Sequence, residues 1–107
     1  MSLDFSLNAA DECVFSRNIT HNLNKMADAA GIYEVLWRPD ENGITKAQQC
    51  IEPLSVGLLE LVRNRAKYEV FYNSPNGWGL YEHFVPFVTA VLTACCDYPD
   101  ADISVSR

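Results

Sequence analysis

Positive charge is scarce in this chain. Eight Lys and Arg residues stand against fourteen Asp and Glu residues among 107, which gives a net charge of −6 at neutral pH. A molecule of this charge repels phosphate backbones and anionic lipid surfaces. We therefore expect neither nucleic acid nor membrane as a partner.

Long apolar runs are missing as well. No stretch approaches the ~18 consecutive apolar residues of a membrane-spanning helix, and the first six residues lack the basic and apolar regions of a secretory signal. The four cysteines show no evenly spaced disulfide framework, since Cys13 and Cys50 are isolated and Cys95 and Cys96 are adjacent. The sequence thus predicts a cytoplasmic protein with reduced thiols, of which Cys50 and Cys95 lie on apolar helical stripes and act as small hydrophobic residues.

Signatures of catalysis and of metal binding are also absent. There is no G-x-S-x-G, C-x-x-C or H-x-x-x-H pattern, and Gly77-Trp78-Gly79 lacks the spacing of a phosphate-binding loop. The two histidines, His21 and His83, fall on different predicted helices, and Glu34 and Glu82 could join them in a site. We expect no cofactor, no metal and no catalytic residue.

The composition that remains is that of one globular domain over residues 1–107, with 49% hydrophobic and 11% aromatic residues. Both ends alternate apolar and polar residues with a period of two, which is typical of half-buried strands. Leu3, Phe5 and Leu7 form the first apolar set, and Ala101, Ile103 and Val105 form the second. Because each strand alone exposes a bare edge, we expect the N- and C-terminal strands to pair and to rest on the helices between them.

Helical spacing dominates the middle of the chain. It predicts one helix from Asn18 or Thr20, either of which can cap it, to Gly31, and a short turn of helix over Ile32 to Trp37. It predicts a long helix capped by Thr45, with a kink or a brief interruption at Pro53, and a last helix over residues 80–95. Tyr68 to Tyr72 is compatible with either a strand or a helix end. The predicted fold is α+β and predominantly helical, with three to four helices and a short two-stranded sheet that pairs the termini.

Two tryptophans next to loops are the most prominent candidate binding residues. Trp37 precedes Arg38-Pro39, and Trp78 lies between two glycines, of which Gly77 is expected at positive φ and Gly79 at a close backbone approach. Either the two indoles plug the ends of the core, with Trp78 packing toward Trp37 or Tyr81, or they are exposed anchors for a partner. The candidate binding residues are His21, Asn22, Trp37, Arg38, Asn76, Trp78 and Tyr81.

A basic cluster, Arg63, Arg65 and Lys67, follows the long predicted helix. Its simplest role is to oppose the negative end of the helix dipole, and the alternative is an anion-binding patch.

Several short motifs spread over nearly the whole chain carry a resemblance. They are Asn18-Ile19-Thr20-His21-Asn22-Leu23, Leu36-Trp37-Arg38-Pro39, Asn76-Gly77-Trp78-Gly79 with Tyr81, and Tyr98-Pro99-Asp100-Ala101. Together they resemble small proteins of unknown function encoded by bacteriophages and prophages. The resemblance implies a bacterial host cytoplasm as the setting, and it assigns no catalytic residue.

Two functions follow as hypotheses. The first is a non-enzymatic interaction factor that docks on a host protein, because an acidic surface complements a basic one. The alternative is a small-ligand-binding or hydrolytic domain, in which aromatic rings stack on a ligand and Arg38 pairs with its anion. Its site would be built from His21, Asn22, Trp37, Arg38, Trp78 and Tyr81. The sequence leaves the oligomeric state open.

Overall fold

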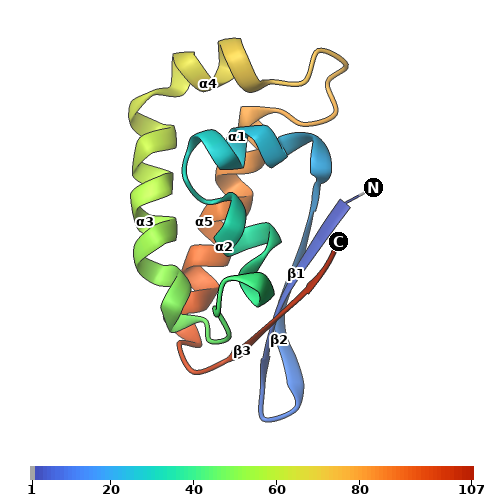
Figure 1. Cartoon of the computed structure of the whole chain (residues 1–107), viewed down its shortest axis with the longest axis vertical. Helices are drawn as coiled ribbons and strands as arrows, with labels where there is room; N and C mark the ends of the chain where they lie inside the picture. Colours follow the sequence, from blue (N-terminus) through green and yellow to red (C-terminus); the bar gives the residue numbers. More distant parts are fainter. Residues whose placement is uncertain (1) are drawn as a thin grey trace.

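The computed structural model describes residues 2–107 and has an α+β fold. Figure 1 shows a helical layer packed along one face of a small sheet, with the two chain ends side by side. The elements in chain order are β1 (Ser2–Ala9), β2 (Glu12–Thr20), the 3-10 helix η1 (His21–Leu23), α1 (Asn24–Ala29), α2 (Tyr33–Trp37), the 3-10 helix η2 (Pro39–Glu41), α3 (Gln48–Arg63), α4 (Arg65–Tyr72), α5 (Tyr81–Asp97) and β3 (Asp102–Ser106).

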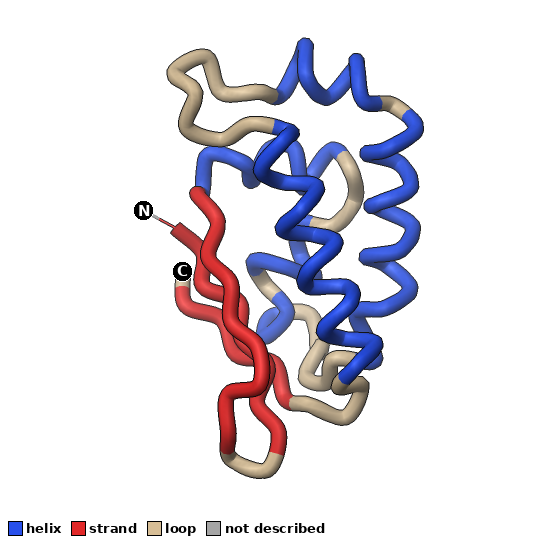
Figure 2. The backbone as a smooth tube through the Cα atoms, turned by 180° about the vertical axis from the view of Figure 1, so that it is seen from behind, coloured by secondary structure: helices blue, strands red, loops and turns tan. Residues whose placement is uncertain are grey.

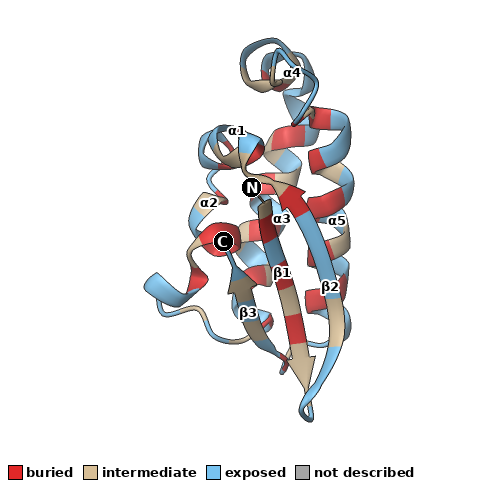
Figure 3. Cartoon of the chain, turned by 90° about the vertical axis from the view of Figure 1, so that its right-hand side faces the viewer, coloured by how far each residue is buried: buried red, intermediate tan, exposed pale blue. Residues whose placement is uncertain are grey.

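The sheet has the strand order β2-β1-β3 and is antiparallel throughout. The predicted pairing of the two termini is confirmed, because Asp4 lies opposite Ser106 and Asn8 opposite Asp102. Leu3, Phe5 and Leu7 of β1 are fully buried against the helices, whereas the outward residues of the same strand are polar, as the alternating colours of β1 in Figure 3 show. The period of two therefore places this apolar set on the core face.

The sheet has three strands and not the two predicted, because β2 forms a hairpin with β1. Asn18 lies in β2 opposite Asp4, to which its amide donates a hydrogen bond of 2.7 Å, so it does not cap a helix. The hairpin turns at Ala10 and Asp11, which have φ values of 51° and 64° without any glycine, and the register shifts between Leu7 and Asn8. A bulged edge strand with a glycine-free turn lacks both of the usual sequence signals of a hairpin.

The predicted end of the first helix and the short second helix are confirmed. Gly31, at φ 80°, separates α1 from α2. Thr20 has the predicted capping role, since its hydroxyl accepts from the Asn22 amide at 3.3 Å, although it caps η1 directly after β2.

The two long helices, α3 and α5, pack against each other on the helical side of the molecule, beside the sheet (Figure 2). Both contain an internal proline, and α3 continues through Pro53 as one helix without a break, as its apolar stripe predicts. Its start differs from the prediction: the helix begins at Gln48, and the Gln49 carboxamide oxygen accepts from the backbone amides of Thr45 and Lys46 at 2.8 and 2.9 Å. The predicted cap by Thr45 was wrong: no side chain caps α3, and the amides of Ala47 and Gln48 donate instead to the carbonyls of Ala101 and Pro99 at 2.9 Å.

Tyr68 to Tyr72, which the sequence left ambiguous between strand and helix, is helical and belongs to α4. Residues 2–107 therefore contain five α-helices, more than the three to four predicted. The buried Tyr68 anchors α4: the hydroxyl donates to Glu60 at 2.7 Å, next to the Ala29 carbonyl at 3.3 Å. Burial is the main reason why the pKa of Tyr68 is raised, which keeps the phenol a hydrogen-bond donor.

All four cysteines are free, and Cys50 and Cys95 are buried in the core as predicted. The end of the chain is held by Arg107, which donates to the Trp37 carbonyl at 2.9 Å and to Asp40 at 2.8 Å. The hydrogen bond from Arg107 is the main cause of the lowered pKa of Asp40.

Candidate functional site

The candidate site lies at the end of the molecule where η1, α1 and the loop between α4 and α5 meet (Figure 1). Trp78 is the most conspicuous residue there, because 72% of its surface is exposed. The predicted packing of Trp78 toward Trp37 or Tyr81 was therefore wrong, and the plug interpretation fails for this residue. The long loop carries its indole away from the core.

The turn that presents Trp78 is nevertheless fixed. The Asn76 carboxamide oxygen accepts from the Trp78 amide at 2.9 Å, and the Asn22 side chain donates to the Trp78 carbonyl at 2.6 Å. Gly77 has the predicted positive φ, 79°. Gly79, at φ 128°, makes the predicted close approach, since a Cβ placed there would lie 2.9 Å from Cβ of Asn22. The backbone on both sides of the indole is thus held against η1.

His21 is tied to the other tryptophan. Trp37 is buried and stacks on Tyr33 with ring centroids 5.6 Å apart. Its indole Nε1–H donates to Nδ1 of His21 at 2.9 Å. Because an indole N–H can only donate, Nδ1 of His21 is the acceptor in this hydrogen bond, and Nε2 is the ring nitrogen that can donate.

Three adjoining hollows surround this segment. The first, of about 460 Å³, is lined by His21, Asn22 and Trp78 together with residues of β1 and β2. The second, also about 460 Å³, shares His21 and Asn22 and continues between α1 and the α4–α5 loop. The third, of about 610 Å³, shares Asn24, Lys25 and Tyr72 with the second. Because the hollows share lining residues, we treat them as one surface, the η1–α1 groove.

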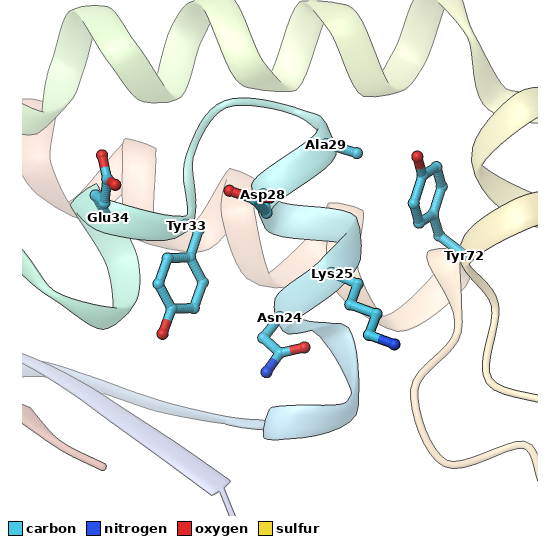
Figure 4. A pocket seen from close by; sticks show the side chains of 7 residues that line it. All are labelled: Asn24, Lys25, Asp28, Ala29, Tyr33, Glu34 and Tyr72. Atoms are coloured by element: carbon cyan, nitrogen blue, oxygen red, sulfur yellow. The ribbon is translucent and has the colours of Figure 1, made fainter.

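Figure 4 shows the third hollow, with Tyr33 and Tyr72 on opposite sides of the α1 residues Asn24, Lys25 and Asp28. The groove combines carboxamides, which both donate and accept hydrogen bonds, with aromatic rings. Its charged residues have both signs, Lys25 against Asp28 and Glu34. Phe71, 74% exposed, adds a second large apolar ring to the lining. Such a surface suits recognition of a mixed polar and apolar partner.

The structure brings only part of the predicted set together. His21, Asn22 and Trp78 line one hollow, Trp37 lies behind His21, and Asn76 shapes the turn. The other two residues lie outside the groove lining.

Tyr81 is buried, and its hydroxyl donates to the Leu61 carbonyl at 2.8 Å. Arg38 forms an ion pair of 2.9 Å with Glu41 and lies 3.4 Å from the Tyr33 hydroxyl; the hydrogen bond to Tyr33 is the main cause of its raised pKa. The Arg38 guanidinium is thus engaged by neighbours within the chain.

Sequence reasoning missed several groove residues, among them Asn24, Lys25, Phe71, Tyr72 and Asn73. Phe71 and Tyr72 fall in the segment that was ambiguous between strand and helix, so their faces could not be assigned. The run Tyr68 to Tyr72, with two tyrosines four residues apart, was the available signal, because both tyrosines stay on one face of a helix.

Residues 2–107 contain no group of three or more His, Cys, Asp or Glu side chains arranged to hold a metal ion. His83, the second histidine, is exposed on α5. In the same residues no helix combines the length and the apolar character that crossing a bilayer requires.

Comparison with known proteins finds no matching family model, no matching curated protein and no matching solved structure. The functional argument therefore depends on the groove itself.

Proposed function

We propose that this protein is a non-enzymatic interaction factor that docks on another protein through the η1–α1 groove and its aromatic rim, Trp78 and Phe71. The observation that supports it is the exposure of these two rings on a fixed backbone. Large aromatic side chains lose little conformational entropy on binding and dominate the energetics of protein interfaces. A tryptophan that is 72% exposed and held by two hydrogen bonds to its backbone is suited to that role.

The partner that we propose is a protein with a basic surface, because the chain carries a net charge of −6. In the phage or prophage setting that the sequence motifs resemble, it is a host protein of the bacterial cytoplasm. Basic surfaces that bind nucleic acid are a target class that an acidic protein of this size can block.

The test is to measure capture of host proteins and thermal melting on the same Trp78→Ala variant. We expect nearly unchanged melting, because the ring contributes little to the core, and loss of the captured basic protein. Tyr98→Ala is the matched control, since Tyr98 is an exposed aromatic residue outside the groove lining. A Trp78→Ala protein that is destabilised by the ~3–5 kcal/mol of a core aromatic, or that captures the partner normally, contradicts the proposal.

A second candidate function has one observation in its favour: His21, Asn22 and Trp78 line a common hollow of about 460 Å³. In this alternative the hollow binds a small polar ligand, with the indole stacked on it and the imidazole Nε2–H as a donor. Trp37 is buried, so a ligand in this hollow quenches or shifts mainly the fluorescence of Trp78. A ligand-induced change that Asn22→Ala reduces supports this function, and a response retained in Trp78→Ala argues against it.

A further inference from the structure

The outward face of α3 carries three apolar residues that the core does not use. Val56, Leu59 and Val62 are 63%, 49% and 55% exposed, whereas the opposite side of the helix, with Cys50, Leu54 and Leu61, is buried. The three are spaced three residues apart, so they form one ridge along the helix. Exposed apolar residues gathered in this way mark an interaction surface more than scattered single residues do.

Opposite charges flank this ridge. Glu52 and Arg63 are eleven positions apart in α3, which is about three helical turns, so both project from the same side of the helix as Val56 and Leu59. Among residues 2–107, the neighbouring charges of α3 and α4 pair within the chain, Lys67 with Glu60 and Arg65 with Glu69. Glu52 and Arg63 form no ion pair with any of these described residues.

The spacing of these residues is self-complementary. The midpoint between Glu52 and Arg63 coincides with the midpoint between Val56 and Leu59. A second α3 laid antiparallel across a two-fold axis at that point brings Val56 against Leu59 of the second copy and Glu52 against its Arg63, each twice. A two-fold interface requires this self-complementarity, because the same surface must serve both partners.

The surface beside the ridge is hollowed where the second helix would lie. A depression of about 540 Å³ opens between the first half of α3 and the α1–α2 turn, lined by Gly31, Glu52, Pro53 and Val56 among others. In the antiparallel arrangement the second half of the other α3, with Leu59 and Arg63, passes over this depression. The hollow and the charge pattern therefore point to the same occupant.

We propose that the outward face of α3 is a self-association surface, on which a second copy of this chain docks with its α3 antiparallel and with two Glu52–Arg63 ion pairs across the interface. The surface shares no lining residue with the η1–α1 groove. Self-association through it leaves Trp78 exposed in both copies.

The test is sedimentation equilibrium of the wild type, of Glu52→Lys, of Arg63→Glu and of an equimolar mixture of the two variants. We expect the wild type to form dimers, and each variant alone to have a dimer dissociation constant at least roughly tenfold higher, because both ion pairs become repulsive. The mixture is expected to recover dimers of wild-type strength. In the mixed dimer the lysine introduced at position 52 of one copy faces the glutamate introduced at position 63 of the other, and the unchanged Arg63 and Glu52 face each other.

A parallel arrangement predicts a different ranking. It would place like charges opposite each other in the wild type, so the mixture would then dimerise more tightly than the wild type. That ranking would contradict the antiparallel interface.

Glu12→Lys is the matched control, because it makes the same change of charge at an exposed residue of β2 and is expected to leave the dimer unchanged. Glu52 and Arg63 are exposed, so circular dichroism melting is expected to show that both variants remain folded. Arg63→Glu is expected to melt slightly earlier than the wild type, because it places a negative charge at the negative end of the α3 dipole. Leu59→Ser provides a second, uncharged disruption that weakens the dimer without affecting any ion pair. A wild type that stays monomeric up to millimolar concentration, or a mixture that dimerises no better than either variant alone, overturns the proposal.

Discussion

The hydrogen bond from the Trp37 indole to Nδ1 of His21 links the first residue of η1 to a buried ring of α2. His21 itself is half-buried and lines the groove, so one side chain serves the packing of the core and the chemistry of the surface. Removing the imidazole leaves a buried N–H without its partner. Such a loss costs the desolvation of the donor in addition to the bond.

We therefore predict that His21→Ala lowers the free energy of unfolding by about 1–3 kcal/mol, more than Thr20→Ala, whose capping bond of 3.3 Å is long and is expected to be worth about 0.5 kcal/mol. Urea unfolding of the two variants measures the ranking. In a Trp37→Phe background the effect of His21→Ala should largely vanish, since the donor is gone. A larger cost for Thr20→Ala would show that the indole finds another acceptor.

Residue types alone favour a larger cost for Thr20→Ala than for His21→Ala. A threonine before a helical stretch is recognisable as a cap, whereas the His21–Trp37 pair joins residues sixteen positions apart and depends on how α2 packs. The same limit applies to the two tryptophans. Both stand beside turn-forming residues, yet only the tertiary structure buries Trp37 and exposes Trp78.

At the scale of elements, a strong periodicity of apolar residues was sufficient to predict a helix or a strand. The last helix, the passage of α3 through Pro53 and the pairing of the terminal strands could all be predicted, because each has one continuous apolar stripe or a clear alternation. β2 could not, because most of its residues are exposed and only Ile19 is buried. An edge strand that buries little on either side shows no alternation.

The strand at the C-terminal end contributes to stability through both pairing and packing. Ile103 and Val105 are half-buried against the core, and Arg107 binds the Trp37 carbonyl and Asp40. We predict that deleting Ile103 to Arg107 lowers the melting temperature by about 10–20 °C, which corresponds to ~2–3 kcal/mol of lost burial in a domain of this size. Differential scanning calorimetry measures the shift.

Removal of Arg107 alone is the control for that deletion, and we expect a much smaller shift from it, because exposed ion pairs contribute little. If the chain without Ile103 to Arg107 melted at the same temperature as the unchanged chain, pairing with β3 would not stabilise β1.

For the whole molecule, the two proposed surfaces lie on different elements. The groove is built by η1, α1 and the α4–α5 loop, and the self-association face is the outward side of α3. A two-fold dimer through α3 therefore displays two grooves at once. When two grooves are linked, binding at one groove raises the local concentration of a multivalent partner at the other. Such a partner is therefore bound more tightly than by one groove alone.

The central position of β1 also has a consequence for the order of folding. Its bonds to β2 close a turn of only two residues, whereas its bonds to β3 join segments at opposite ends of the described chain. Closing a long loop costs more chain entropy, so the contacts with β3 are expected to form after the rate-limiting step. In stopped-flow experiments Ile103→Ala should then accelerate unfolding and leave refolding nearly unchanged, whereas Ile19→Ala in β2 should slow refolding. A chain that recruits its last strand late presents an unpaired edge of β1 while it folds, and that short interval is when it is most exposed to aggregation.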